Sequence, residues 1–272
     1  MRHKLMLIDC DRTLLNDDGC VTERTRRAIK DSIARGVKVV FASGRAPGGV
    51  ENVIKAIGAE SIFDYYVCYN GGIILRSRDK YIINENYLTV DDVIRITENV
   101  YCEPRTCYVL TQDRIICNDT NIHATIEADK NSIEVIKGDV RLLGDKEKIF
   151  KVVFADEKER LDETELRIPE TLRKQYNVTR SEPNNLEFVS RYASKGRALI
   201  KLAEVLNIRI EDTICFGDSG NDSSMIELAG TGVAMGNANE ELKGIADIIT
   251  DNNNNDGLAK AIEKYVLKPQ KV

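Results

Sequence analysis

Leu5-Met6-Leu7-Ile8-Asp9-Cys10-Asp11-Arg12-Thr13, close to the start of the chain, is an apolar run that ends in two acidic residues. A short uninterrupted apolar run is typical of a strand that is buried on both faces, as in a parallel sheet. Asp9 and Asp11 lie two positions apart, so in an extended chain both carboxylates can face one pocket. The segment therefore predicts a core strand with a pair of acids at its carboxyl end. By itself the pair also fits a solvated turn, because the chain contains 44 acidic residues.

On both sides of a central region, apolar runs alternate with amphipathic stretches. In the first third we expect a helix from the N-cap Thr22 to Gly36, a strand over residues 37–42, a helix between Pro47 and Gly58, and a strand over residues 65–69. The last third repeats the alternation up to a final helix over residues 258–266. This pattern predicts a Rossmann-like α/β core of three layers, in which helices cover both faces of a parallel sheet.

The middle of the chain, roughly residues 84–185, differs in composition and pattern, with more charge, polar helices and alternating strand-like runs. An α+β cap inserted between two halves of one core is the simplest architecture, because the core strands can then pair across the insertion. We therefore predict three segments, namely the first part of the core at residues 1–84, the cap at 85–186 and the second part of the core at 187–272.

Composition limits the classes of function. The net charge is −5 with both signs interspersed, so no basic face is available for a nucleic-acid backbone. The apolar run before Asp9 is too short for a signal peptide, and no segment reaches the roughly 18 apolar residues of a membrane span. We therefore expect a cytoplasmic protein that binds neither nucleic acid nor membrane.

Cysteine and histidine contents exclude several kinds of site. The seven cysteines are an odd number without a Cys-x-x-Cys pair, which predicts reduced and mostly buried thiols. Only His3 and His123 are present, so a histidine-based zinc site or catalytic triad is almost excluded.

Three further motifs accompany predicted core elements. Ser43-Gly44-Arg45 follows the second strand, where a hydroxyl and exposed amides could hold a phosphate oxygen. Ser194-Lys195-Gly196 opens a helix and offers an ammonium group to an anion. Gly217-Asp218-Ser219-Gly220-Asn221-Asp222 follows another strand and presents oxygen ligands suited to a hard cation. Each motif alone also fits an ordinary turn or a solvent-facing lysine, but together they gather at the sheet edge where parallel sheets bind ligands.

The motifs bring Asp9, Asp11, Asp218 and Asp222 to one edge, where their negative charges must be compensated. Two carboxylates about 4 Å apart repel by about 4 kcal/mol at an effective dielectric constant of about 20. Either proton uptake or a metal ion relieves this repulsion. Oxygen ligands without cysteine or histidine point to Mg²⁺, which bridges to a substrate phosphate, and Lys195 adds a second positive charge.

In this order, the motifs D-x-D-x-T, S-G-R, K-G and G-D-x-x-N-D resemble those of the haloacid dehalogenase superfamily of phosphohydrolases. The position of the insertion, between the second and third motifs, is similar to that of the Cof-type class IIB members, which carry an α+β cap. The likeness extends to Asn70-Gly71-Gly72 and to residues 232–238. It implies a Mg²⁺-dependent phosphatase that acts on a small phosphorylated metabolite, such as a sugar phosphate, through an aspartyl-phosphate.

The resemblance also implies a role for each motif residue. Asp9 would be the nucleophile and a metal ligand. Asp11 would be the general acid and then the general base, and its backbone carbonyl would bind the metal, for which Asp218 would be the other ligand. The phosphoryl oxygens would be held by Ser43, Lys195, Asn221 and the amides of Cys10 and Gly44, while Asp222 and Thr13 would support the metal site and the first loop.

Arg12 departs from the common form D-x-D-G-T, in which glycine occupies this position. If the position requires a positive φ, an arginine there is strained. If it does not, the guanidinium either points harmlessly to solvent or leans toward the cap and contacts an anionic substrate. We expect the solvent-directed arrangement.

The cap should select the substrate, because it closes over the pocket and excludes water. Four cap residues could face a sugar or a second phosphate, although we expect ordinary surface or core positions for each: Tyr101, Arg105, His123 and Arg180. Two other functions share the core. A phosphotransferase or phosphomutase would pass the phosphate to a second hydroxyl, and a non-catalytic protein would only bind a phosphorylated ligand, which the intact motifs disfavour. We expect a monomer or a small homo-oligomer.

Overall fold

The structure is a computed structural model that describes residues 3–58, 63–100, 107–119, 122–144 and 146–268. Its strands are β1 (Leu5–Ile8), β2 (Lys38–Ala42), β3 (Tyr65–Cys68), β4 (Ile73–Arg76), β5 (Ile82–Glu85), β6 (Cys107–Leu110), β7 (Arg114–Cys117), β8 (Glu134–Lys137), β9 (Lys151–Ala155), β10 (Tyr176–Glu182), β11 (Asn185–Ser190), β12 (Thr213–Gly217), β13 (Gly232–Ala234) and β14 (Ile248–Ile249). Its α-helices are α1 (Glu23–Ala34), α2 (Pro47–Ile57), α3 (Val90–Asn99), α4 (Ile122–Asn131), α5 (Lys158–Leu166), α6 (Glu170–Gln175), α7 (Lys195–Leu206), α8 (Ser223–Leu228), α9 (Glu240–Ile245) and α10 (Gly257–Ile262).

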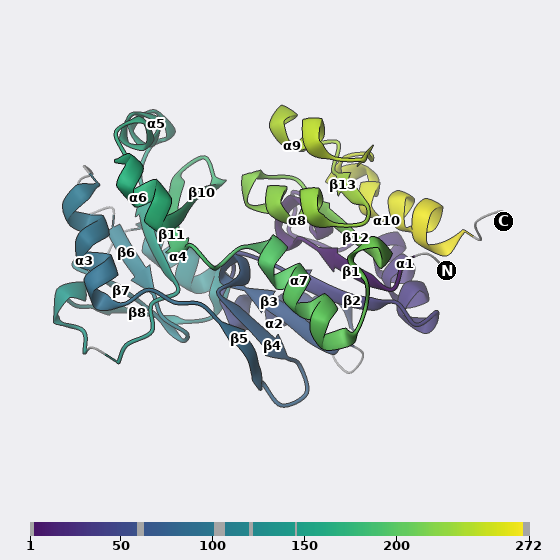
Figure 1. The fold of residues 1–272 in the computed structure, drawn as a ribbon, viewed down its shortest axis with the longest axis horizontal. Coiled ribbons are helices and arrows are strands. Elements are labelled where there is room, and N and C mark those ends of the chain that lie inside the picture. Colours follow the sequence, from purple (N-terminus) through teal and green to yellow (C-terminus); the bar gives the residue numbers. More distant parts are fainter. Residues whose placement is uncertain (1–2, 59–62, 101–106, 120–121, 145, 269–272) are drawn as a thin grey trace.

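The larger sheet has eight strands in the order β14-β13-β12-β1-β2-β3-β4-β5 (Figure 1). β1 pairs in parallel with β2 and β12, which places Ile8 beside both Phe41 and Phe216. Strands from the first and last thirds of the chain therefore pair across the insertion, as the sequence predicts. The segments that follow β1, β2 and β12 meet at one edge of the sheet, and these segments carry the motifs.

Helices cover both faces of this sheet. Buried side chains of α1, α2 and α10 pack on the face that carries Met6 and Ile8, and those of α7, α8 and α9 pack on the face that carries Leu5 and Leu7. Neighbouring residues of β1 point to opposite faces, so one apolar strand contributes to both layers. The arrangement confirms the predicted three-layer α/β fold.

Local signals in the sequence explain where the first helices begin and end. The Thr22 hydroxyl accepts the backbone N–H of Thr25 at 3.2 Å and so caps α1. Pro47 occupies the first turn of α2, and Gly58 ends that helix in the left-handed conformation with φ 65°. Both boundaries agree with the sequence-based expectation.

The second sheet has six strands in the order β10-β11-β9-β6-β7-β8 and comes from the middle of the chain. Buried residues of α3, α5 and α6 share one apolar cluster with Val109, Phe154 and Phe188 of this sheet. The opposite face of this sheet carries α4. Its buried side chains belong to a second apolar cluster, which also contains residues of the core. This unit is the expected α+β cap, and Figure 1 shows it beside the core, in teal and blue-green on the left.

Cap and core meet at an aromatic contact. The ring of Tyr69, from the core, stacks on that of Phe150, from the cap, with centroids 5.2 Å apart. The Tyr69 hydroxyl also donates to the backbone carbonyl of Thr111 at 2.6 Å. The division at 84/85 and 186/187 stays a prediction. Since β11 runs through the second of these positions within the cap sheet, we propose that the core resumes after Ser190.

Two expectations from composition concern the chain as a whole. Among the helices of the described ranges, none has both the length and the apolar character needed to cross a membrane. The thiols of Cys10, Cys68, Cys117 and Cys215 are buried, as expected for most cysteines, whereas Cys20 is exposed.

Candidate active site

A buried lysine joins two acids at the carboxyl edge of the core sheet. Asp9 directly follows β1 and is 5% exposed. Lys195, the first residue of α7, is fully buried, and its Nζ lies 2.5 Å from Asp9 Oδ1 and 2.6 Å from Asp222 Oδ1. Burial alone would lower the pKa of Lys195, but the charges of Asp222 and Asp9 outweigh burial and raise it, so the ammonium stays charged. Burial raises the pKa of Asp9, and the charge of Lys195 opposes that rise.

The loop after β12 is held together by Asp222. Its Oδ2 accepts the backbone N–H groups of Asp218 at 3.0 Å and Ser219 at 3.1 Å. A side chain at Gly217 would collide with Asp222, since a Cβ there would lie 2.5 Å from Asp222 Cγ. Thr13 Oγ1 donates to Asp218 Oδ1 at 3.2 Å, which links the first loop to this one. The supporting roles of Thr13 and Asp222 stay predictions, and these contacts place both residues against Asp218.

Asp9, Asp218 and Asp222 form a cluster in which one carboxylate oxygen from each residue lies within 4.8 Å of the other two. Burial, and then the charge of Asp222, raise the pKa of Asp218 to about 7. Such a pKa indicates that the cluster lacks positive charge even with Lys195 present. Oxygen donors alone suit a hard divalent cation, and both oxygens of Asp222 already accept hydrogen bonds. The residues therefore fit a metal ion held by Asp9 and Asp218.

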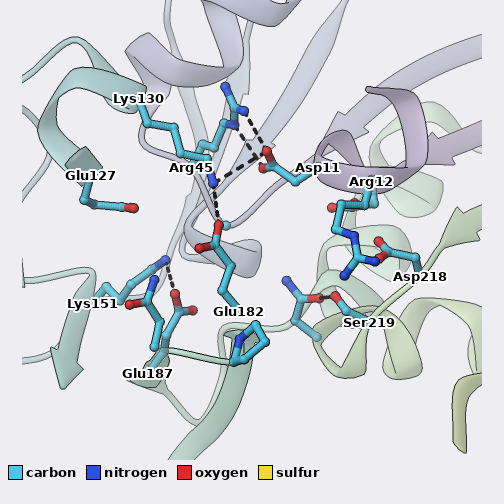
Figure 2. Close-up of a pocket in the computed structure, with 15 residues that line it drawn as sticks. Asp11, Arg12, Arg45, Glu127, Lys130, Lys151, Glu182, Glu187, Asp218 and Ser219 are labelled. Carbon is cyan, nitrogen blue, oxygen red and sulfur yellow. Dashed lines mark hydrogen bonds and ion pairs between the residues drawn. The ribbon is translucent and has the colours of Figure 1, made fainter. Parts of the chain in front are cut away.

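Asp11 does not join this cluster, although it lines the same pocket as Asp9. The chain turns after Asp9, and the Asp11 carboxylate faces two cations (Figure 2). Arg45 donates from Nε to Oδ2 at 3.0 Å and from Nη2 to Oδ1 at 2.6 Å, and Lys130 Nζ lies 3.5 Å from Oδ1. Burial alone would raise the pKa of Asp11, but the Arg45 hydrogen bonds and the Lys130 charge outweigh it and lower that pKa. The sequence predicts that four acids share one cluster, but the structure brings only three of them together, without Asp11.

The predicted phosphate-binding residues divide between the pocket wall and the layer behind it. Gly44 and Asn221 line the pocket. Cys10, Ser43 and Lys195 are fully buried behind the wall, and the Ser43 hydroxyl accepts the backbone N–H of Arg45 at 3.2 Å. Gly44 has little room for a side chain, because a Cβ there would lie 3.1 Å from Asn70 Oδ1.

Arg12 adopts a positive φ of 59°, so the strain considered for an arginine at this position is present. Its side chain is exposed, as expected, but it lines the pocket, and Figure 2 shows its guanidinium directed at Asp218. The Arg12 charge opposes the rise in the pKa of Asp218. The expectation of a guanidinium directed only to solvent is therefore wrong, because the left-handed backbone turns the side chain toward the loop after β12.

The pocket has a volume of about 300 Å³ and lies between core and cap. The cap contributes Glu127, Lys130, Lys151, Glu182, Pro183, Asn185 and Glu187. Two ion pairs organise this wall. Lys130 Nζ lies 2.9 Å from Glu182 Oε1, and Lys151 Nζ lies 2.8 Å from Glu187 Oε1, with both side chains of the second pair almost completely buried. The described part of the wall is thus almost entirely polar.

A hydrogen-bonded chain links this wall to the acidic loop of the core. Asn221 Nδ2 donates to Asn70 Oδ1 at 3.0 Å, and Asn70 Nδ2 donates to Glu187 Oε2 at 3.3 Å. Asn70 adopts a positive φ of 55° in the turn after β3, a conformation that asparagine tolerates better than most residues. The turn therefore connects the core and cap sides of the pocket.

The cap residues considered from the sequence are not those that the structure brings to the pocket. His123 and Arg180 do not line it, and Arg180 instead pairs with Asp162 and Glu165. Tyr101 and Arg105 lie outside the described residues.

Sequence reasoning missed the charged residues that do line the cap side. A signal existed for one pair, because Lys151 and Glu187 are each the lone charge in an otherwise apolar strand run. A charge buried in such a run requires a partner of opposite sign, so the two could have been matched. Lys130 and Glu182 carry no such signal, since both stand in polar surroundings.

The chain matches known proteins along almost its whole length. The family of haloacid dehalogenase-like hydrolases matches residues 6–262. The putative phosphatase YxeH of Bacillus subtilis is 33% identical over 97% of this chain and 99% of its own. The 5-amino-6-(5-phospho-D-ribitylamino)uracil phosphatase YcsE of the same bacterium is 31% identical over 97% of this chain and 96% of its own. A solved haloacid dehalogenase-like hydrolase from Bacteroides thetaiotaomicron has a TM-score of 0.81 at 31% identity and covers 96% of this chain and 98% of its own.

Proposed function

The chain belongs to the haloacid dehalogenase-like hydrolases of the Cof type and is a phosphatase, and we propose that it hydrolyses small phosphate monoesters with Mg²⁺ through an aspartyl-phosphate on Asp9. The observation that carries the proposal is the buried group of Asp9, Lys195 and Asp222 beside Asp218. A phosphate monoester is an anion, and a carboxylate can attack it only where positive charge offsets the repulsion. Lys195 supplies one such charge next to Asp9.

The reaction then follows as two displacements at phosphorus. Asp9 attacks the phosphorus atom, and the ester oxygen leaves with a proton from Asp11. Asp11 next takes a proton from water, which attacks the phosphorus of the aspartyl-phosphate and releases inorganic phosphate with Asp9 restored. Asn221 and the Gly44 amide hold the phosphoryl oxygens from the pocket wall, and the buried Lys195 supplies positive charge through its contact with Asp9. Mg²⁺, when bound by Asp9, Asp218 and the Asp11 carbonyl, supplies further neutralising charge and alignment.

Substrate binding must rearrange the contacts of Asp11. Arg45 and Lys130 favour the charged form of Asp11, whereas the first step requires a proton on it. A bound substrate that takes over these two cations with its hydroxyl or anionic groups removes that obstacle. The pairing therefore favours substrates with polar groups close to the scissile ester.

The described pocket favours a small polyhydroxylated leaving group, such as that of a sugar phosphate. A volume of about 300 Å³ is at the small end for ligand pockets, and no aromatic side chain lines it among the described residues. YcsE, by its name, acts on a substrate with a uracil ring, for which the described wall offers no stacking surface. Small phosphate esters are thus the proposed partners of this site.

The test is release of inorganic phosphate from a panel of phosphate monoesters, with and without Mg²⁺, by the wild type and by Asp9→Asn and Asp11→Asn. We expect Mg²⁺-dependent release from sugar phosphates, a loss of at least about 10³-fold in Asp9→Asn, and a loss in Asp11→Asn that is largest for esters with poor leaving groups. Full activity in Asp9→Asn, or no release from any ester, would overturn the proposal. Phosphate that reappears on a second sugar hydroxyl without net release would identify a phosphotransferase instead.

A further inference from the structure

The carboxyl end of α4 is the part of the cap that reaches into the core beside the active site. Lys130 and Asn131 are its last two residues. Lys130 spans the pocket, with its ammonium between Asp11 of the core and Glu182 of the cap, as Figure 2 shows. Asn131 is fully buried, which is unusual for an asparagine at the end of a helix.

Asn131 makes a polar contact with Ala46, the residue that caps the start of α2. Its Oδ1 accepts the backbone N–H of Ala46 at 2.5 Å, and its Nδ2 donates to the backbone carbonyl of Glu127 at 2.8 Å and to Glu127 Oε1 at 3.0 Å. Ala46 immediately follows Ser43-Gly44-Arg45. The amide is therefore fixed from one side by the core helix and from the other by the cap, directly beside the phosphate-binding loop and Arg45.

Two consecutive glycines in α2 make this approach possible. A Cβ on Gly48 would lie 2.5 Å from the Asn131 backbone oxygen, and a Cβ on Gly49 would lie 2.7 Å from Asn131 Oδ1. Neither glycine has a positive φ, so backbone conformation does not require them. Glycine favours a helix less than alanine does, and here it leaves room for the end of α4.

We propose that Asn131 is a positioning residue, which docks the cap on the start of α2 and thereby holds the Lys130 ammonium beside Asp11 and Arg45. The inference rests on the proposed function for its kinetic consequence, but the docking itself does not depend on it. Asn131 touches neither the substrate nor the reacting atoms. It acts through Lys130, one residue away, and through the amide of Ala46.

The first test is hydrogen exchange of the Ala46 amide in wild type and Asn131→Ala, measured on peptides of residues 43–54 without any ligand. The buried acceptor should protect this amide, and its removal should speed exchange by about tenfold or more, since the closed arrangement becomes less populated. This readout needs no activity. Unchanged exchange at Ala46 would overturn the docking role, whether or not the protein releases phosphate from any ester.

The second test is kinetic and uses the best ester of the panel with Mg²⁺. Asn131→Ala should raise KM by about tenfold and change kcat by less than about threefold, because a smaller closed population weakens apparent binding. Gly48→Ala should give a similar rise, since its methyl group pushes on the Asn131 carbonyl while the Asn131 side chain remains. Gly244→Ala is the matched control, because that helical glycine has no atom within 4 Å of its Cβ position.

A double substitution shows whether Asn131 acts through Lys130. Lys130→Met should raise KM by itself, and Lys130→Met with Asn131→Ala should raise it no further than Lys130→Met alone. If the two changes raise KM independently, so that their effects multiply, the proposal is contradicted. It is also contradicted if Asn131→Ala lowers kcat by the same factor as it raises KM and lowers Tm as well. If the wild type releases no phosphate, the proposed function fails, and the exchange measurement alone decides the docking role.

Discussion

Asp218 is a buried acid whose neighbouring positive charges do not fully offset its burial and the nearby carboxylates. It lies beside Asp9 and Asp222, and its pKa is raised to about 7, first by burial and then by the charge of Asp222. Lys195 and Arg12 lower it again without cancelling the rise. In the absence of a metal ion, Asp218 therefore carries a proton over much of the acidic range, and a cation that binds there must displace it.

The metal-free protein should lose stability as the pH rises through this range. The folded-state pKa of about 7 lies above the value of about 4 in an unfolded chain, so the folded protein holds a proton that the unfolded chain has released. Between pH 5 and pH 8 this single group should lower the free energy of unfolding by roughly 2–3 kcal/mol. Urea unfolding in EDTA should show that fall in the wild type and a smaller fall in Asp218→Asn. The same pH dependence in both proteins would contradict the assignment.

Arg12 carries backbone strain that a glycine would not. An L-residue other than glycine pays about 1–2 kcal/mol for the left-handed region, where Arg12 lies with φ 59°. Arg12→Gly should therefore raise the free energy of unfolding by about 1 kcal/mol, less the entropy that glycine adds to the unfolded chain.

The control for Arg12→Gly is Arg12→Ala, which removes the guanidinium but keeps the strained Cβ. Chemical denaturation of both variants separates the two effects: only the glycine variant should gain stability. An equal gain in both would show that the Arg12 side chain beyond Cβ, and not the backbone, sets the cost of Arg12.

At the scale of elements, the turn after β3 joins the acidic loop to the start of α7. Gly71 has a φ of 99°, and a Cβ there would collide with the backbone carbonyl of Ser194, the residue before Lys195. Gly71 is thus required both by its conformation and by its neighbour. Any displacement of Ser194 would move Lys195, which is wedged between Asp9 and Asp222.

Gly71→Ala should therefore destabilise the protein more than the backbone conformation alone explains, and should reduce phosphatase activity. Gly36→Ala is the matched control, because Gly36 has a φ of 85° with nothing near its Cβ position. We expect a loss of about 1 kcal/mol in Gly36→Ala and about 3 kcal/mol or more in Gly71→Ala, measured by denaturant unfolding. Equal losses would mean that Ser194 moves aside at no cost.

Elements also explain how much of the site could be predicted. β1, β2 and β12 and the motifs after them are local patterns, in which an apolar run ends in a polar group, so both the fold and the acidic cluster follow from the sequence. The direction of Asp11 does not, because Cys10 leaves the extended conformation directly after Asp9. Alternation along a strand stops applying where the strand ends.

At the scale of the whole molecule, the part that escaped prediction is the contact between cap and core. Lys130, near the end of α4, reaches both Asp11 of the core and Glu182 of the cap, which lies 52 residues further along the chain. Nothing in either local sequence signals the pairing. The stacked Tyr69 and Phe150 likewise depend on how two separately patterned units pack. We expect substrate selection to belong to this level, since cap residues line one side of the pocket.

The function itself depends on both units, because Asp9 is supplied by the core and the cap encloses it. If the proposed mechanism holds, phosphorylation of Asp9 should be observable in Asp11→Asn, where loss of the general base would slow hydrolysis of the intermediate. An ester with a good leaving group, such as p-nitrophenyl phosphate, needs no proton from Asp11 in the first step. The intermediate should therefore accumulate in this variant.

The decisive measurement is the mass of the Asp9-containing peptide after Asp11→Asn is mixed with p-nitrophenyl phosphate and Mg²⁺ and quenched in acid. We predict one added phosphoryl group on Asp9, present with Mg²⁺, absent in EDTA and absent when Asp9→Asn is also introduced. Phosphate on any other residue, or product release by the wild type with no phosphorylated Asp9 peptide in the variant, would contradict the proposed mechanism.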